Sequence, residues 1–420
     1  MTFAELWEAL LPLGRDAGTG GCRRYAFTDA DLACRQWFFK ASAERGLRAG
    51  ADANGNLWAW WDPAPAALGG PGAAGPGDGR GPGGAVVTGS HLDSVPDGGA
   101  YDGPLGVVSG FAAVDRLRAQ GFAPARPLAV AAFCEEEGGR FGLACLGSRL
   151  LTGAVAPQDA AALRDGQGVT LAEAMTAAGL DPARIGPDDE LLGRIGVFVE
   201  LHIEQGAALN GLGAAVGIAE GIWPHGRWRL DFTGRADHAG TTRLEDRRDP
   251  MLPFAATVLE ARQAAAAYGA LATFGKVTAE PGGANAICSS VRAWLDARAP
   301  DQAVLDHLVG QVEAAARRAA AAQGVEVGAH RESFTPPVAF DPALAARLAR
   351  ALAARGITAP VLPTGAGHDA GVLAARLPTA MLFVRNPTGV SHSPAEHAER
   401  ADCEAGVSAL AAVLEELAGP

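Results

Sequence analysis

The stretch that decides the fold is residues 85–106, AVVTGSHLDSVPDGGAYDGPLG. It opens with a short apolar run, AVVTGS at 85–90, of the kind that forms a buried strand in a parallel sheet. After Asp102 the apolar residues recur at spacings of four, three and three, the period of a helix, at Val107, Phe111, Val114 and Leu117. A strand, a polar loop and a helix in this order predict a β-α unit.

Three further apolar runs have the same character, and patterns typical of helices lie between them. They are PLAVAAF at 127–133, VFVELHI at 197–203 and AMLFV at 380–384. Strands that alternate with helices predict an α/β domain with a mostly parallel sheet.

The middle of the chain has a different pattern. Apolar and polar residues alternate in RWRLDFTG (227–234) and VRAWLDAR (291–298), which predicts strands with one solvated face. Helical patterns at 250–268 and 301–322 lie among them. We therefore expect an inserted α+β domain at 212–328, with the α/β domain formed by 1–211 and 329–420. The Gly- and Pro-rich stretch at 63–84 predicts a surface loop.

Composition excludes several classes of protein. A chain of 420 residues, at roughly 150 per domain, suggests two or three domains or one large domain with an insertion. A net charge of −12 argues against nucleic acid or an anionic membrane as a partner. Neither a signal peptide nor a transmembrane run is recognisable, and the six cysteines are scattered without a C-x-x-C pair. These features predict a soluble, cytoplasmic protein with reduced thiols.

Imidazoles and carboxylates follow, or end, the predicted buried strands. In an open α/β sheet, ligands bind outside the carboxyl ends of the strands, so four separate segments would bring these groups to one edge. They supply His91, with Asp93 and Asp102 close behind, the triplet Glu135, Glu136 and Glu137, His202 with Glu204, and His392.

Imidazole nitrogens and carboxylate oxygens are good ligands for divalent metal ions. Three histidines and several carboxylates exceed what one tetrahedral ion requires, which favours two ions sharing a bridging carboxylate. Such a pair can activate a water and polarise a carbonyl, and an extra carboxylate can then carry the proton. Zinc and manganese both suit these ligands, and the sequence does not choose between them.

At these residues the chain resembles the hydantoinase/carbamoylase amidases, a family within the superfamily of two-metal aminoacylases and peptidases. The family includes allantoate amidohydrolase, N-carbamoyl-L-amino acid hydrolase and β-ureidopropionase. The matching motifs, in the family's order, are GSHLDSVPDGGAYDGPLG (89–106), EEEGGRFG (135–142), ELHIEQG (200–206), GRADHAGTT (234–242), GAGHDAG (365–371) and GVSHSPAEH (389–397).

The resemblance implies roles for the residues in these motifs. His91 and His202 would each bind one of two divalent ions, and Asp102 would bridge the ions. Glu137 and His392 would complete the second metal site, and Glu136 would be the general base. Asp93 would orient the imidazole of His91.

The resemblance also implies a lid, in which His238 stabilises the oxyanion while Asn285 and Arg298 hold the substrate carboxylate. An arginine fork suits a planar carboxylate. Gln205 and His368 would be further substrate contacts. In this family the inserted domain also pairs two subunits, which implies a homodimer whose lid residues act in their own subunit or across the dimer.

The implied reaction is hydrolysis of the ureido (carbamoyl) C–N bond of a small carboxylate substrate, releasing ammonia and carbon dioxide. The stretches LACLGSRLLTG and FVRNPTGVSHSPAE resemble allantoate amidohydrolases of bacteria more closely, which favours allantoate as the substrate. N-carbamoyl-L-amino acids and β-ureidopropionate are the alternatives. A peptidase or aminoacylase is disfavoured by His202, because related peptidases carry a carboxylate there. A non-catalytic carboxylate binder is disfavoured by the complete ligand set.

Three departures from the family pattern affect the expected pocket rather than the metal ligands. The chain reads HAGTTRL instead of HAGTTPM, NAIC instead of NVIP, and FVRN at 383–386 instead of FVPS. The last change places Arg385 close to His392 in the sequence, where it would suit a substrate with two ureido arms. The remaining histidines are expected to be structural, with His225 in a loop, His397 on a helix surface, and His307 and His330 on the surface or in packing.

Overall fold

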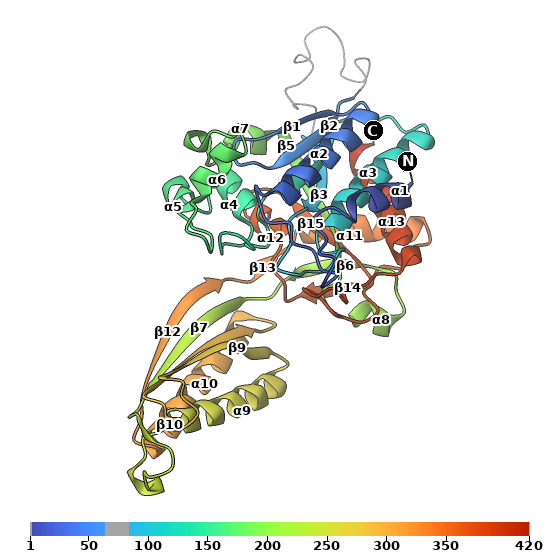
Figure 1. Cartoon of the computed structure of the whole chain (residues 1–420). Helices are drawn as coiled ribbons and strands as arrows, with labels where there is room; N and C mark the ends of the chain where they lie inside the picture. The colour runs from blue at the N-terminus through green and yellow to red at the C-terminus, as the bar shows by residue number, and fades with distance from the viewer. Residues whose placement is uncertain (1, 64–83, 420) are drawn as a thin grey trace. The chain divides into compact units, whose positions relative to one another are not determined.

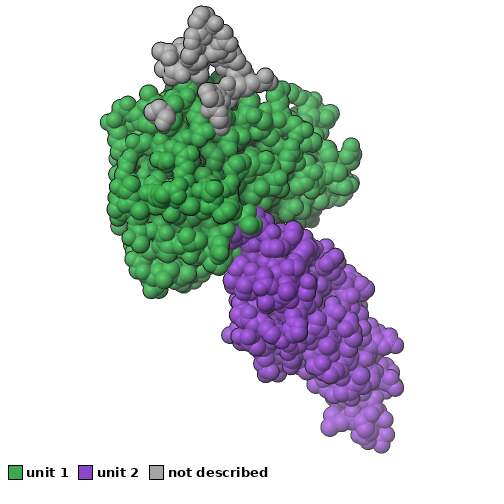
Figure 2. Space-filling view, turned by 180° about the vertical axis from the view of Figure 1, so that it is seen from behind, with its two compact units in different colours: residues 1–220, 339–420 green, residues 221–338 purple. Residues whose placement is uncertain are grey.

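The computed structural model of the chain describes residues 2–63 and 84–419. The chain divides into two compact units, which Figure 2 colours separately. Unit 1 is formed by residues 1–220 and 339–420, and unit 2 by residues 221–338. The predicted loop at 63–84 lies, apart from its two end residues, outside the described residues.

The limits of the insertion differ from those predicted. Unit 2 begins at 221 rather than 212 and ends at 338 rather than 328. At the first limit, strand β6 (Val216–Ile222) still pairs with β15 (Thr379–Val384) of the large sheet, for example Ile218 with Leu382. At the second, β12 (Glu326–Thr335) runs past residue 328 and stays paired to β7 (His225–Thr233).

Unit 1 contains the predicted parallel sheet. Its core is β4 (Leu128–Phe133), β3 (Ala85–His91), β5 (Ile195–Ile203) and β15, in that order and all parallel. These are the four strands predicted from the apolar runs. On either side lie the antiparallel strands β1 (Arg48–Ala51), β2 (Leu57–Trp61) and β6 (Figure 1). The short strands β13 (Val338–Ala339) and β14 (Val361–Thr364) pair with β6.

The four parallel strands are buried almost throughout, as their unbroken apolar sequences require. Helices α3 (Pro104–Ala119) and α13 (Arg400–Ala418) pack against the sheet and against each other, and α12 (Asp369–Leu373) contacts β5 and β15. Helix α3 begins with Pro104 directly after Gly103, a favourable first position for proline. The helices of unit 1 are α1 (Phe3–Leu10), α2 (Asp29–Glu44), α3 (Pro104–Ala119), α4 (Leu146–Thr152), α5 (Pro157–Ala161), α6 (Leu171–Ala177), α7 (Asp189–Arg194), α8 (Ala208–Leu212), α11 (Pro342–Ala354), α12 (Asp369–Leu373) and α13 (Arg400–Ala418).

Unit 2 is an antiparallel sheet with two helices, as the alternating pattern predicted. The sheet order is β12-β7-β11-β9, with β11 at Ser290–Arg298 and β9 at Leu271–Glu280. Helices α9 (Met251–Tyr268) and α10 (Gln302–Ala322) pack with the apolar residues of β7 and β11 in one core. A short pair, β8 (Asp237–His238) with β10 (Ala286–Ile287), lies outside the sheet. No helix among the described residues is long and apolar enough to cross a membrane.

Candidate metal centre

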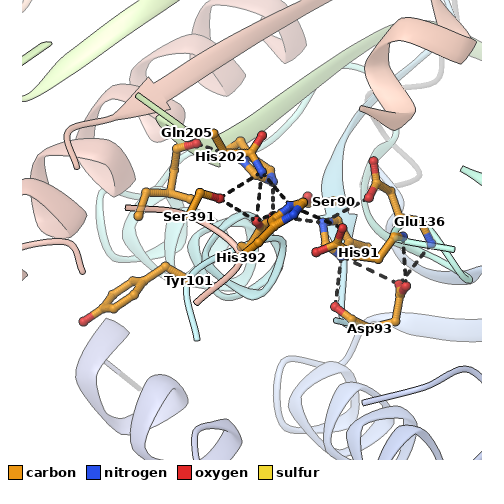
Figure 3. Close-up of polar contacts among 12 residues, drawn as sticks. Ser90, His91, Asp93, Tyr101, Glu136, His202, Gln205, Ser391 and His392 are labelled. Carbon is orange, nitrogen blue, oxygen red and sulfur yellow. Dashed lines mark hydrogen bonds and ion pairs between the residues drawn. The ribbon is translucent and has the colours of Figure 1, made fainter. Parts of the chain in front are cut away.

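The imidazoles and most of the carboxylates predicted to converge do meet at the carboxyl edge of the parallel sheet (Figure 3), whereas Glu204 accepts the backbone N–H groups of Ala208 and Leu209 instead. His91 is the last residue of β3, and Glu135 to Glu137 follow β4 after Cys134. His202 is the penultimate residue of β5, and His392 lies in the loop that follows β15. Parallel strands end at the same edge, so residues far apart in the chain are brought together.

Asp102 lies at the centre of this cluster. Its Oδ1 is 3.1 Å from Nε2 of His202 and 3.6 Å from Nε2 of His91. Its Oδ2 is 3.4 Å from Nε2 of His392. One carboxylate therefore faces three imidazoles, with one oxygen toward the first two and the other toward the third.

The two buried imidazoles are oriented by backbone carbonyls. Nδ1 of His91 lies 3.1 Å from the carbonyl oxygen of Asp93, and Nδ1 of His202 lies 2.8 Å from that of Ile203. Each Nδ1 therefore donates its proton to a carbonyl, which leaves Nε2 as the ring nitrogen that faces Asp102. Among the described residues neither Nε2 has a hydrogen-bond partner, although both are buried.

The carboxylates of the Glu triplet are placed by Asp93. Its two oxygens accept the backbone N–H groups of Glu136 and Glu137 at 3.1 and 3.0 Å. Oε2 of Glu136 then lies 3.6 Å from Nε2 of His91, and Oε2 of Glu137 lies 3.5 Å from Nε2 of His392. Asp93 thus contacts both the imidazole of His91 and the segment that carries the two glutamates.

Glu135 has a different environment. Its backbone has a φ of 55°, and its Oε1 accepts the N–H groups of Arg140 and Phe141. It therefore stabilises the turn after the triplet.

The protonation of the cluster reflects burial of many acids in a small volume. Burial raises the pKa of Glu136 well above its usual range, with the repulsion of Asp369 and Glu137 adding to it, and raises the pKa of Glu137 to about 8. For Asp102, burial acts in the same direction, but the neighbouring imidazoles of His202 and His91 outweigh it and hold the pKa well below its usual range. Divalent cations among these groups would relieve the repulsion between carboxylates.

The donor set fits divalent metal ions. Ligand atoms within 4.8 Å of one another come from His91, Asp102 and His202 in one group, and from Asp102, Glu137 and His392 in a second. Buried polar atoms normally have partners, so the partnerless Nε2 atoms of His91 and His202 and the partnerless Oε1 of Glu137 fit a site for metal ions. Asp102 belongs to both groups, the position predicted for a bridging carboxylate.

A third group, Glu200, His202 and His368, also has ligand atoms within 4.8 Å. It does not add an independent site, because His202 has one free ring nitrogen and that atom already faces Asp102. Glu200 is instead held by Oγ of Ser90 at 2.7 Å and by the backbone N–H of Ala370 at 3.0 Å.

Gln205 and His368, predicted as substrate contacts, both lie at the cluster. Nε2 of Gln205 donates to Oδ2 of Asp102 at 2.9 Å and approaches Nε2 of His392 at 3.3 Å. The buried ring of His368 packs edge-on against that of His202, with 4.5 Å between centroids. Burial, with the nearby His202, lowers the pKa of His368 well below its usual range, so its imidazole is neutral.

Glu396 is a supporting residue that the sequence did not single out. Its Oε1 accepts the backbone N–H groups of Tyr101 and Asp102, both at 3.0 Å, and its Oε2 accepts from Ser391 at 3.4 Å. It therefore connects the loop of Asp102 to the loop of His392. The sequence indicated this supporting role only through the position of Glu396 in the motif GVSHSPAEH, four residues after His392. For Glu200, the signal was an acid inside the apolar run VFVELHI.

Glycine is required next to this cluster for steric reasons. A Cβ on Gly103, whose φ is 83°, would lie 2.4 Å from ring atoms of His91. A Cβ on Gly99 would lie 2.2 Å from Oε1 of Glu396. The glycines of DGGAYDG thus let the Asp102 loop approach the imidazole and the supporting carboxylate.

Arg385 does not have the position expected of a substrate contact. Its guanidinium makes two hydrogen bonds of 2.8 Å to the carboxylate of Asp402, near the start of α13. The pair anchors the chain after β15 to that helix, and its geometry is the bidentate one that arginine prefers. The prediction that Arg385 suits a second ureido arm was therefore wrong.

In unit 2, the predicted lid residues fall into two places. His238 and Asn285 are neighbours, because His238 pairs with Ala286 and the N–H of Ala239 donates to the carbonyl of Asn285 at 3.0 Å. Arg298 is the last residue of β11, where its guanidinium donates to Asp296. Eight residue steps separate Ser290 from Arg298, about 26 Å along an antiparallel strand.

Two other histidines differ from expectation. His225 is not in a loop but is the first residue of β7, directly paired with Arg298. His397 precedes α13 rather than lying on a helix, and its ring meets that of Tyr101 edge-on.

Comparison with known proteins agrees with the resemblance that the sequence motifs indicated. Residues 87–416 match the model of peptidase family M20/M25/M40. The chain belongs to this family. Among its relatives, an N-carbamoyl-L-amino acid amidohydrolase of Geobacillus stearothermophilus is 36% identical over 97% of this chain and 96% of its own length. An allantoate amidohydrolase of Escherichia coli is 33% identical over 99% and 98%.

A solved structure of a hydantoinase/carbamoylase family amidase from Burkholderia ambifaria has a TM-score of 0.84 and 34% identity, over 100% of this chain and 98% of that one. The predicted resemblance and the predicted fold class are thus confirmed. As a member of the M20/M25/M40 family, the chain is a hydrolase, and the candidate ligand groups agree with the metal dependence of that family.

Proposed function

We propose that this chain is a di-metal amidohydrolase that cleaves the ureido C–N bond of a small carboxylate substrate. The observation that carries the proposal is the arrangement around Asp102, where three imidazoles and Glu137 supply two ligand groups and Glu136 lies beside them. His91 and His202 would hold one ion, Glu137 and His392 the other, and Asp102 would bridge them. The names of the relatives support hydrolysis of ureido compounds.

Two divalent ions, when bound, would supply an activated water and a polarised carbonyl. Glu136 takes a proton from the attacking water and returns it to the leaving nitrogen. Its buried carboxylate lies beside the ligand groups, with Oε2 at 3.6 Å from Nε2 of His91, where it is placed to accept and release that proton. Asp93 keeps Glu136 in place through the backbone N–H at 3.1 Å. His238 would stabilise the developing oxyanion, and Asn285 and Arg298 the substrate carboxylate.

Within this class we favour allantoate, with N-carbamoyl-L-amino acids and β-ureidopropionate as the alternatives. The sequences of the motifs at 143–153 and 383–396 support allantoate. The relatives named allantoate amidohydrolase and N-carbamoyl-L-amino acid amidohydrolase have similar sequence identity to this chain, so identity does not decide between the two substrates. Arg385, which was expected to suit the second ureido arm of allantoate, pairs with Asp402 and so no longer supports this substrate.

The test is ammonia release by the chelator-treated protein after reconstitution with zinc or manganese. Allantoate and a set of N-carbamoyl-L-amino acids are offered side by side under each metal. Metal-dependent release from allantoate alone supports the favoured substrate, and preference for a carbamoyl amino acid keeps the mechanism but corrects the substrate. Absence of release from every ureido compound would contradict the proposed function.

We also propose that unit 2 is a lid that pairs two copies of the chain. Helix α9 carries an outward apolar face, with exposed Leu252, Ala255, Ala256 and Leu259. Strand β9 ends the sheet order and exposes Leu271 and Val277, so it has an unpaired edge among the described residues. An exposed apolar helix beside an unpaired strand edge suits a second copy of the same surface.

The separation within unit 2 supports the same proposal. His238 and Asn285 lie beyond one end of β11 and Arg298 lies at the other, about 26 Å apart along the strand. A small carboxylate substrate cannot touch both ends in one copy, so we propose that the two ends come from different subunits. Leu252→Glu combined with Leu259→Glu should give a monomer by light scattering, whereas Leu212→Glu, an exposed leucine of unit 1, should not.

A further inference from the structure

The three imidazoles of the candidate metal centre are held in two different ways. His91 and His202 have 1% of their side-chain surface exposed and are fixed through Nδ1 by backbone carbonyls. The side chain of His392 is 50% exposed, and the hydrogen bond and ion pairs that the described residues make with its ring are all at Nε2. Its position therefore depends on its own backbone.

That backbone is unusual. His392 has a φ of 54°, in the left-handed region that residues other than glycine rarely adopt. Such a conformation persists only where the surrounding structure determines it. The loop must therefore be fixed by something other than the imidazole.

Asn386 fixes the loop. Its side chain is fully buried, and its Oδ1 accepts hydrogen bonds from the N–H of Thr388, the hydroxyl of Thr388 and the N–H of Gly389, at 3.0–3.1 Å. Its Nδ2 donates to the carbonyl of Val390 at 2.8 Å. One amide group thus bonds to three residues of the loop immediately before Ser391 and His392.

The base of the loop is anchored as well. Arg385 pairs with Asp402, and its N–H donates to the carbonyl of Ala215 at 3.0 Å. Asn386 and Arg385 are the two residues at which FVRN differs from the FVPS of the resembling family. The hydroxyl of a serine at 386 could donate one hydrogen bond and accept two, fewer than the four that the amide of Asn386 makes.

We propose that Asn386 is a positioning residue for His392, and through it for the second of the two metal ions. The inference rests on the proposed di-metal function. Among the described residues, Asn386 makes no hydrogen bond to a candidate metal ligand. By fixing the backbone of the loop, it has the role for His392 that the Nδ1 hydrogen bond has for His91 and for His202. Its removal should weaken the ion held by Asp102, Glu137 and His392 and leave the ion held by His91 and His202 bound.

The experiment is a titration of chelator-treated protein with Zn²⁺, in competition with a chromophoric chelator, which counts bound ions and gives their affinities. The wild type should bind two ions. Asn386→Ala should bind one with unchanged affinity and the other about 10- to 100-fold more weakly, the usual cost of losing a partner that orients a ligand. Asn386→Asp keeps the acceptor oxygen and should recover part of this loss.

Two comparisons separate positioning from a general effect on folding. Asn54→Ala removes an equally buried loop asparagine, bonded to the backbone of Gly186, and should lower the unfolding midpoint without changing either affinity. His392→Ala and the double variant with Asn386→Ala should bind Zn²⁺ alike, because the two residues act on one ion. Unchanged second-ion affinity in Asn386→Ala, equal weakening of both ions, or additive losses in the double variant would overturn the proposal. A wild type that binds no Zn²⁺ would overturn the proposed function with it.

Discussion

Gly103 lies so close to the imidazole of His91 that a Cβ at this position would be 2.4 Å from the ring. The ring cannot move away freely, because Nδ1 is bonded to the carbonyl of Asp93. Gly103→Ala should therefore displace His91 and lower both bound metal and turnover, by about 10-fold or more. Gly121→Ala is the matched control, since Gly121 also has a positive φ but a Cβ there meets nothing within 4 Å. Equal activity of the two variants would show that the contact is unimportant.

Glu136→Gln should leave both ions bound and reduce kcat by about 10²- to 10⁴-fold, because the amide cannot accept the proton. The measurements are metal content and the rate of ammonia release. Glu135→Gln is the neighbouring control, and it should retain most of the activity because the amide oxygen still accepts from Arg140 and Phe141. Normal turnover in Glu136→Gln would remove that residue from its proposed role.

The metal-free protein should lose stability as the pH rises from about 5 to 8. Burial raises the pKa of Glu135 and Glu396 to about 7 and that of Glu137 to about 8. In this interval the folded state binds more protons than the unfolded state, so its free energy of unfolding falls as the pH rises. Unfolding midpoints of the chelated protein at pH 5.5 and 8 would show the trend, and Zn²⁺ should raise the midpoint more at pH 8. A chelated protein more stable at pH 8 would contradict the prediction.

Mixed dimers test whether lid residues act across subunits. Glu136→Gln and His238→Ala should each be nearly inactive. If the two residues serve one reaction from different chains, an equal mixture that exchanges subunits should recover about a quarter of wild-type activity, because half of the dimers are mixed and each has one intact site. Mixtures that stay inactive after subunit exchange would place both residues in the same chain.

Much of this architecture was predictable because its signals are local. The four parallel strands are unbroken apolar runs. The helical patterns at 250–268 and 301–322 agree with α9 and α10 to within a few residues, and α3 follows the helical spacing after Asp102. The convergence of His91, His202 and His392 was predictable from the rule that parallel strands end at one edge.

The supporting contacts were less predictable because they depend on residues far apart in sequence. Glu396 reaches the backbone of Asp102, almost 300 residues earlier, and Arg385 turns to Asp402 instead of toward the site. Neither local pattern nor composition specifies which of several polar partners a side chain will choose. The boundary of the insertion was misplaced for a similar reason, since β6 belongs to unit 1 by its pairing with β15.

The position of β15 determines the order in which this protein can be completed during its synthesis. β15 lies between β5 and β6 in the sheet, yet it is made after all of unit 2. Unit 2 is continuous in sequence, so all of its residues have been synthesised once Val338 has been added. β5 and β6, in contrast, lack their shared neighbour β15 until residues 379–384 emerge from the ribosome. The nascent chain therefore contains all of unit 2 before it contains all strands of the sheet, and His392 is the last of the candidate ligands to be made, so no partial product of translation can have the complete ligand set.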